Sequence, residues 1–291
     1  MFPGQFGNAN KCLRVNSVSN AYTGTFNVTG GSNPCKYFVF FCNNGTGSIT
    51  WEKGIGNVQY ALVGGGGAGM GPGSIVTTAG TGGNGGAVVV GQSQDPNLNG
   101  DIISVGSSNV VQNCTVGAGG TAINFLANDG GNTTWNSRTA TGGLGGSEGP
   151  ASASGGAGSG GAGNANGSGG IGTFVNLLLE NPNASSFPTT AYNPVTGVVG
   201  TSLYSYPYYG AGGGGGDTVR RANTAAYTNV GGQYLGGFGM LWPTGDSLYS
   251  PATGSFGGGG GGGGNITNAG TTYYRSGAAG GAGFVLLRTQ Y

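Results

Sequence analysis

Glycines that recur at every third position constrain the fold of this chain more than any other feature. In the longest glycine tract, residues 155–172, two of the three registers are almost free of side chains. The first register reads Gly155, Gly158, Gly161, Asn164, Gly167 and Gly170. Most side chains fall in the third register, which holds Ala162, Ala165, Ser168 and Ile171. A period of three predicts a left-handed extended helix of the polyglycine II type, with three residues per turn and no internal hydrogen bonds.

A helix of this kind depends on its neighbours. Its N–H and C=O groups point outwards, and buried backbone groups require hydrogen-bond partners. Ordering glycine also costs more backbone entropy than ordering any other residue. We therefore expect several tracts to pack side by side and to bond laterally, with side chains kept out of the inner registers. The tracts lie at residues 64–73, 80–86, 117–120, 142–149, 155–172, 210–216, 231–239, 254–264 and 277–283.

Short apolar segments between the tracts predict β-strands. Residues 37–42 and 48–52 flank the turn sequence NNGTG, a pattern typical of a hairpin. Helices are nearly excluded, because each glycine costs about 1 kcal/mol in a helix interior. The predicted fold class is therefore all-β and irregular: short β-strands plus packed polyglycine II helices, with almost no α-helix. Further strands rich in Val, Ile, Leu and Phe are expected at residues 58–63, 87–90, 102–105, 109–116, 173–179 and 284–289.

Composition argues against the other classes of glycine-rich chain. Collagen needs an unbroken, proline-rich Gly-X-Y register, but this chain has 11 Pro, and runs such as residues 257–264 ignore the period. Disordered segments combine low hydrophobicity with high net charge. Here 36% of the residues are hydrophobic, 6% are charged and the net charge is +1. A flexible linker is disfavoured because the tracts alternate with apolar strands. We therefore expect the chain to fold.

Residues for catalysis and cofactor binding are scarce. The chain has no His, so Ser-His and Cys-His pairs are impossible, and its 8 acidic residues form no close pair. A glycosidase pair assembled from distant acids stays an alternative. Residues 67–72 lack the Lys-Ser/Thr and the following helix of a phosphate loop, and residues 212–217 resemble a calcium repeat only in their glycines. We expect no catalytic residue, cofactor, metal or small-molecule substrate.

Charge, hydropathy and cysteine spacing also limit the partners. The 9 Lys and Arg are scattered along the chain, so nucleic acid is not expected. The longest apolar run, residues 37–42, is too short to cross a membrane. The first ten residues lack the pattern of a signal peptide, and none is expected. Cys12, Cys35, Cys42 and Cys114 have no metal-type spacing. Free thiols are expected, with a Cys12–Cys35 or Cys35–Cys42 disulfide as the alternative.

The strand-to-glycine junctions follow a distinctive order along the chain. They read YALVGGGG at residues 60–67, GGNGGAVVVG at 82–91, TVGAGGT at 115–121, YGAGGGGG at 209–216 and GGAGFVLLR at 280–288. This order resembles the glycine-rich domain of virion proteins from large DNA viruses and of phage tail fibres, and more loosely the glycine-rich region of some receptor kinases. The resemblance covers residues 37–291. Residues 1–36 do not match and are interpreted as an amino-terminal arm or attachment segment.

The resemblance implies a structural protein of a virus particle, with no cofactor and no catalysis. Its partners would be other capsid or fibre proteins, and it would be located in a virion assembled in the host cytoplasm. The first hypothesis is a minor capsid or cement protein of a large DNA virus. The alternative is a receptor-binding adhesin of a phage-type tail fibre or capsid fibre. Phage adhesins of this kind usually carry a different amino-terminal attachment region, which favours the capsid role.

Clustered aromatic residues are the candidates for partner binding. Tyr204, Tyr206, Tyr208 and Tyr209 lie directly before a glycine tract, and Trp242 follows the next one. Tyrosine offers rigid contact area with a polar tip, which suits a recognition surface. The same rings could instead cap the end of the glycine stack and shield its edge. Both interpretations stay open at the level of the sequence.

Overall fold

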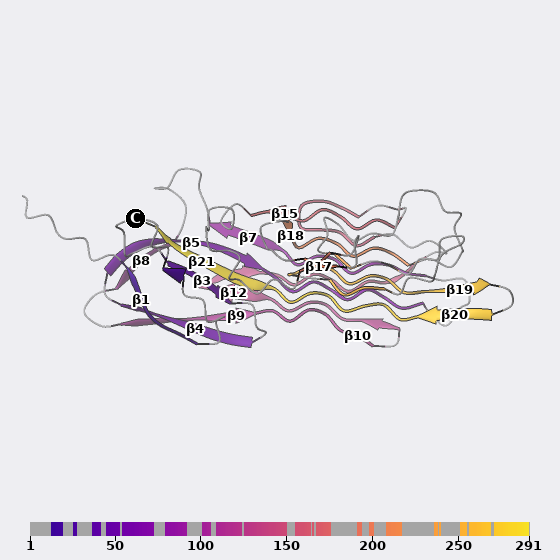
Figure 1. Ribbon diagram of the computed structural model, residues 1–291, viewed down its shortest axis with the longest axis horizontal. Coiled ribbons are helices and arrows are strands. Elements are labelled where there is room, and N and C mark those ends of the chain that lie inside the picture. Colours follow the sequence, from indigo (N-terminus) through magenta and orange to yellow (C-terminus); the bar gives the residue numbers. More distant parts are fainter. Residues whose placement is uncertain are drawn as a thin grey trace, which may run out of the picture.

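The molecule is elongated, with two β-sheets at one end and glycine tracts along the rest of its length (Figure 1). The regular elements among the described residues are all strands, which confirms the predicted fold class. The computed structural model describes residues 13–19, 26–27, 37–41, 45–52, 54–72, 79–91, 101–105, 109–123, 125–149, 155–163, 165, 167–175, 191–193, 198–200, 208–216, 236–237, 239, 251–254, 256–268 and 271–290.

Two antiparallel sheets form a sandwich at one end. The five-stranded sheet has the order β1 (Arg14–Ser19), β4 (Gly45–Glu52), β9 (Val110–Val116), β12 (Thr133–Trp135) and β13 (Arg138–Ala140). The six-stranded sheet has the order β2 (Phe26–Asn27), β3 (Tyr37–Phe41), β21 (Phe284–Gln290), β5 (Gly54–Val63) and β7 (Val88–Gly91), and β8 (Asp101–Val105) also pairs with β5.

Five short two-stranded sheets complete the described strands. Two of them join neighbouring segments as hairpins far from the sandwich. The pairs are β6 (Ala79–Gly80) with β14 (Glu148–Gly149), β10 (Ala122–Ile123) with β11 (Leu126–Ala127), β15 (Thr173–Phe174) with β18 (Tyr208–Tyr209), β16 (Ala191–Asn193) with β17 (Val198–Gly200), and β19 (Gly264–Asn268) with β20 (Thr271–Arg275).

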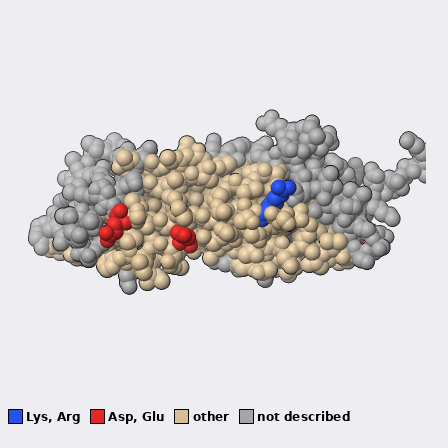
Figure 2. Space-filling view, turned by 180° about the vertical axis from the view of Figure 1, so that it is seen from behind, with Lys and Arg blue, Asp and Glu red and all other residues tan. Residues whose placement is uncertain are grey.

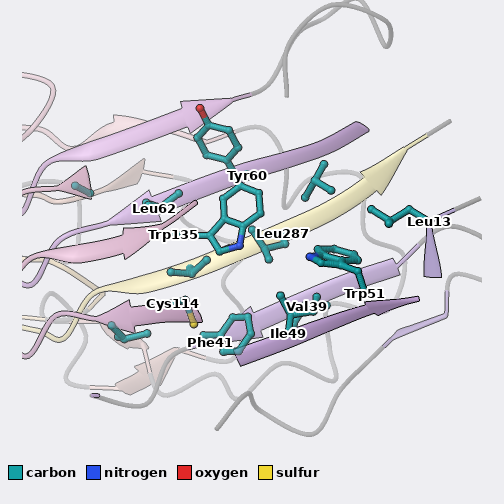
Figure 3. Packing of buried hydrophobic residues seen from close by; sticks show 14 residues of the cluster. Leu13, Val39, Phe41, Ile49, Trp51, Tyr60, Leu62, Cys114, Trp135 and Leu287 are labelled. Carbon is teal, nitrogen blue, oxygen red and sulfur yellow. The ribbon is translucent and has the colours of Figure 1, made fainter. Parts of the chain in front are cut away.

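The hydrophobic core lies between the two large sheets (Figure 3). Alternation along each strand sends every second side chain inwards; in β4, Ile49 and Trp51 are fully buried while Ser48 and Thr50 are only partly covered. The indole Nε1 of Trp51 donates a hydrogen bond to Gln112 Oε1 at 2.9 Å. The buried cluster comprises Leu13, Val39, Phe41, Ile49, Trp51, Val58, Tyr60, Leu62, Cys114, Val116, Trp135, Ala140, Val285 and Leu287.

Strands of both sheets continue directly into glycine tracts. We call the hydrogen-bonded tracts together the glycine bundle. It also contains residues 210–216 and 257–263 and runs along the molecule to the end that carries β19 and β20 (Figure 1). The tracts that adjoin strands are 64–70 (β5), 81–87 (β7) and 278–283 (β21) from one sheet, and 117–120 (β9), 128–132 (β12) and 141–147 (β13) from the other.

Hydrogen bonds within the bundle repeat every three residues. In the tract at residues 64–70, one register of N–H groups donates to residues 81–87, the next to residues 128–131 and the third to residues 278–281. This is the predicted three-fold geometry. The bonds, at 2.8 to 3.0 Å, run from Gly64 to Ala87, Gly67 to Asn84, Met70 to Thr81, Gly65 to Gly131, Ala68 to Asn128, Gly66 to Gly281 and Gly69 to Ala278.

The carbonyl groups of the same tract are bonded to a second set of neighbours. They accept N–H groups from residues 143–146, from Gly120 and from residues 260–263, at 2.7 to 2.9 Å. The tract at residues 64–70 is thus enclosed by six other segments, three that accept from it and three that donate to it. Lateral bonding thus pairs every N–H group of this tract and most of its carbonyl groups with backbone of other tracts.

Polar side chains complete the hydrogen bonding where a neighbouring carbonyl is missing. Each accepts a backbone N–H from the adjacent tract, so it takes the place of a carbonyl oxygen. The few side chains within the tracts therefore fix which tracts are neighbours. The bonds run from Ala157 N to Asn84 Oδ1 (2.9 Å), Gly142 N to Asn132 Oδ1 (2.9 Å), Gly145 N to Asp129 Oδ1 (2.7 Å) and Ser147 N to Thr81 Oγ1 (2.8 Å).

The predicted hairpin over residues 37–52 is wrong. β3 pairs with β2 and β21 in one sheet, whereas β4 pairs with β1 and β9 in the other. β3 and β4 therefore lie in different sheets of the sandwich. The two strands still meet through side chains, because a Cβ built at Gly47 would lie 2.8 Å from Cδ1 of Phe41. Glycine at position 47 lets the Phe41 ring lie on the opposite sheet.

The register of residues 155–172 predicted one continuous helix. The structure instead shows a turn within this tract. Gly158 and Gly161 form an isolated antiparallel bridge, so the chain reverses between them. Residues 155–158 and 168–172 then lie side by side, with Gly170 N bonded to Gly156 O at 2.9 Å. The cause is conformational: glycine and serine allow a tight turn that the three-residue pattern does not exclude.

Part of the predicted amino-terminal arm belongs to the domain. β1 pairs with β4 over Arg14↔Glu52 to Ser19↔Ser48, and Leu13, at 2% exposure, lies in the hydrophobic cluster. The predicted boundary at residue 37 therefore does not separate an arm from the domain, at least for residues 13–19. Deleting residues 1–36 would remove an edge strand and a core side chain.

The burial of Cys114 predicts how the stability of the protein depends on pH. Its thiol is 1% exposed, and burial raises its pKa from 9.0 to about 11, against a smaller opposite effect of a backbone hydrogen bond with Gly47. Between pH 9 and 11 the unfolded chain loses this proton and the folded chain keeps it, so stability should fall as the pH rises. Burial raises the pKa of Tyr209 and acts in the same direction.

The measurement is the free energy of unfolding in denaturant at pH 8 and at pH 10. We expect lower stability at pH 10, and a smaller loss in Cys114→Ala, which lacks the titrating thiol. An equal loss in both proteins would show that Cys114 does not contribute. Cys12, Cys35 and Cys42 lie outside the described residues, so neither predicted disulfide is placed by the structure.

Candidate partner-binding surface

The predicted aromatic cluster is only partly placed. Tyr204, Tyr206 and Trp242 lie outside the described residues. Tyr208 and Tyr209 form β18, which pairs with β15 through Phe174↔Tyr208 and Thr173↔Tyr209. The cluster therefore reaches the start of the tract at residues 210–216, as the sequence indicates.

Tyr209 is part of the interior. Its side chain is 0% exposed, and its ring meets Phe284 edge-on, with ring centroids 4.9 Å apart and an interplanar angle of 81°. Phe256 lies 6.5 Å from Tyr209 and 6.2 Å from Phe284, so the three rings form one group. A ring in this position stabilises the junction between strand and bundle by packing. For Tyr209, capping of the glycine stack describes the geometry and surface contact does not.

Unusual backbone conformations bring these three rings together. Gly210, directly after Tyr209, has a φ of 68°, and Phe256 and Gly257 have φ values of 42° and 78°. Positive φ is strained for phenylalanine, and it persists only where the surroundings hold it. Here the strained turn sends the chain into the tract at residues 257–263 while the Phe256 ring stays against Tyr209. The site is therefore structural.

Exposed apolar side chains gather instead at the β10–β11 hairpin. Ile123, Phe125 and Leu126 are 56%, 50% and 68% exposed, and Leu144 on an adjacent tract is 60% exposed. The sequence analysis missed this group, although the apolar run AINFLA between two glycine tracts was a visible signal. Other exposed large apolar residues are spread over different elements: Val110, Val111, Ile171 and Tyr274.

Charged side chains are sparse on the described surface. Figure 2 shows one face with two small acidic areas and one basic area on an otherwise uncharged surface. Arg138 lies over the ring of Tyr60 at 5.9 Å from its centroid. Arg288 is 9% exposed, and its guanidinium donates to Oε1 of Gln59, its cross-strand partner. These two arginines thus pack within or against the sandwich.

Among the residues that the structure describes, no group of three or more His, Cys, Asp or Glu residues could hold a metal ion. The same residues include no helix with the length and hydropathy needed to span a bilayer.

Comparison with known proteins identifies the domain. A search of curated proteins finds no match to this sequence. A family described as glycine-rich domain matches residues 42–290, which is most of the chain. The matched region begins just after β3 and includes β4, the glycine bundle and all of β21. The chain therefore belongs to the glycine-rich domain family.

Proposed function

We propose that the protein is a non-catalytic structural component of a virus particle, a minor capsid or cement protein that joins larger shell proteins. The observation that carries the proposal is the enclosed tract at residues 64–70, bonded to six neighbouring segments. Its interior is backbone alone, held by short lateral hydrogen bonds. Bonding to so many neighbours favours one fixed arrangement of the tracts, which suits a spacer between other proteins.

The resemblance of the strand-to-glycine junctions to those of virion proteins supports the same function. So does the charge distribution, because only 9 basic and 8 acidic residues occur among 291. Contacts of such a surface would consist mainly of uncharged hydrogen bonds and apolar burial. These are the contacts that fill gaps in a permanent assembly.

A fibre-tip adhesin is the second candidate, and the topology favours it in one respect. In the part of the chain that the structure describes, the hairpins β10–β11 and β19–β20 connect tracts towards the end of the bundle away from the sandwich (Figure 1). The β19–β20 hairpin lies at that end (Figure 1) and carries Tyr274, which is 56% exposed. An end made of loops is suited to recognition, because loops are positioned there by a rigid scaffold.

Location separates the two roles. Virus particles would be purified from the cells in which the protein is made and labelled with antibodies against the folded protein. The labelled particles would then be imaged by negative-stain electron microscopy. We expect label across the shell. Label confined to fibre tips would replace the cement role by the adhesin role. Absence of the protein from purified particles would reject both.

A further inference from the structure

Lateral hydrogen bonding gives the glycine bundle no boundary of its own. A tract at the outside of such a bundle directs N–H groups away from it, as the edge strand of a β-sheet does, and unpaired groups of this kind are a template for further pairing. Among the described residues, the tract at residues 141–147 has backbone bonds to three segments, at residues 64–70, 81–87 and 128–132. Its other sides would accept further tracts unless something prevents it.

Exposure follows the three-residue register on this side of the bundle. The side is formed by the tracts at residues 117–121, 128–132 and 141–147, which are neighbours because Gly131 N bonds to Ala118 O (2.7 Å) and Gly130 N to Gly143 O (2.8 Å). Every exposed residue of these three tracts carries a side chain, whereas each of their glycines is buried or half-buried. The exposed residues are Ala118, Thr121, Asn128, Asp129, Asn132, Thr141, Leu144 and Ser147.

Two of these side chains accept N–H groups that do not point into the bundle. Successive N–H groups of a three-fold helix point one third of a turn apart, so one register donates inwards and the next donates sideways. In a larger bundle, the sideways register would bond to the carbonyl groups of a further tract. The inward bonds run from Gly143 to Gly65 O and from Gly146 to Ala68 O, both at 2.8 Å, and the sideways bonds from Gly142 to Asn132 Oδ1 (2.9 Å) and from Gly145 to Asp129 Oδ1 (2.7 Å).

We propose that the exposed side chains of these tracts terminate the glycine bundle, so that a second copy of the chain cannot add its own glycine tracts to this face. Asn132 and Asp129 take the place of the carbonyl groups of an added tract. The other exposed side chains keep its backbone too far away to bond. The inference concerns the free protein and does not depend on a role in a virus particle.

Contacts inside the bundle show why a single carbon atom is enough. A Cβ built at Gly142 would overlap the carbonyl oxygen of Gly130, and one built at Gly143 would overlap that of Asn84. Two tracts therefore reach bonding distance only where the facing register is glycine. A row of residues that each carry a Cβ excludes the same approach from outside.

The first test is amide hydrogen exchange, measured residue by residue by NMR on the full chain. Asn132→Ala removes the acceptor of the Gly142 N–H group but keeps the Cβ. We expect exchange at Gly142 to become faster on the order of tenfold, because the bond to the side chain is lost. Gly143 is the internal control, since its N–H group bonds inwards and its exchange should not change. Unchanged exchange at Gly142 would overturn the proposal.

The second test separates the Cβ atoms from the hydrogen bonds. One variant carries glycine at positions 129, 132, 141 and 144, and its matched control carries alanine at the same four positions. Both variants lose the same side-chain acceptors, but only the glycine variant loses the Cβ atoms. Sedimentation velocity over a concentration series should show dimers or larger species for the glycine variant alone. Equal sedimentation of the two variants, or a wild-type protein that associates as strongly as the glycine variant, would reject the proposal.

A check on the fold accompanies this comparison. The N–H groups of Gly66 and Gly69 bond to Gly281 and Ala278 in a tract that carries none of the four changes. Their protection from exchange should be the same in both variants as in the wild-type protein. If the fourfold glycine variant loses this protection, the pair Asn132→Gly and Asn132→Ala replaces it. The glycine variant of this pair should also associate more strongly than the alanine variant, and the reverse order or no difference would reject the proposal.

Discussion

Gly83→Ala is expected to destabilise the folded protein by about 3 kcal/mol or more, because it inserts a side chain where backbone meets backbone. A Cβ at position 83 would overlap the carbonyl oxygen of Gly67 and lie 2.5 Å from that of Ala68. Neither oxygen can swing away as a side chain would. Gly83 is also bonded on both sides, from its N to Gly260 O (2.9 Å) and from Gly213 N to its O (2.8 Å), so moving it breaks further bonds.

Gly161→Ala is the matched control for this prediction. A Cβ there would meet only the Ile171 side chain, with Cγ1 at 3.3 Å, and a flexible side chain can move by a few tenths of an ångström. We expect a change within about 1 kcal/mol. The three-residue registers of the tracts at residues 80–86 and 155–172 predict similar damage at Gly83 and Gly161, but the turn removes Gly161 from the inner packing. Thermal or denaturant unfolding measures both; equal losses would contradict the role of lateral packing.

Trp51→Ala is expected to cost about 3–5 kcal/mol, the range for truncating a buried aromatic side chain. Trp51 is 0% exposed in the centre of the sandwich. Its removal leaves a cavity and takes the Nε1 donor away from Gln112 Oε1. Trp51→Phe is the control that keeps most of the packing and loses only the hydrogen bond, so it should cost about 1–3 kcal/mol.

The Trp51→Ala variant also tests whether the sandwich and the glycine bundle unfold together. Because β5, β9 and β21 continue into tracts of the bundle, loss of the sandwich should also release the tracts. Circular dichroism would follow the strands, and amide hydrogen exchange would follow the glycine tracts, across the same denaturant series. Coincident midpoints are expected. Tracts that stay protected after the strands have melted would show that the bundle is stable alone.

The sequence was informative wherever a physical rule acts over a few residues. A three-residue register predicted lateral bonding, and the tract at residues 64–70 confirms it because a side chain in the inner rows has no room. Most predicted strands, such as β5, β9 and β21, were also recovered, because apolar β-branched runs bounded by glycine have few other solutions.

Sequence-based prediction failed where the pairing of a strand depends on residues far away along the chain. The NNGTG sequence at residues 43–47 is locally a good hairpin turn, but its last three residues begin β4, and β21 and β9 pair with β3 and β4 instead. No local pattern reveals that competition, because β9 and β21 lie far along the chain from β3 and β4. The turn at residues 158–161 was missed for a related reason: glycine permits helix and turn alike.

The candidate site was hard to predict because aromatic residues serve both cores and interfaces. Tyr209 has the composition of a recognition residue, yet Phe284, 75 positions further along the chain, covers its ring. Conversely, Phe125 belongs to none of the predicted strands or aromatic clusters, and its side chain is half exposed. Whether an aromatic side chain is buried depends on which tract lies next to it. The arrangement of the tracts depends in turn on the whole bundle.

The enclosed tract also sets the order of events when the protein is synthesised. Gly66 bonds to Gly281 and Gly69 to Ala278, so two of its partners are made more than 200 residues later. At roughly 5–20 residues per second, that delay on the ribosome lasts roughly 10–40 s. During this delay, the apolar strand β5 is present while β21, its neighbour in the sheet, has not yet been made. The bundle can therefore close only after residues 278–281 have been synthesised, and a nascent chain that stops before them has no enclosed tract at all.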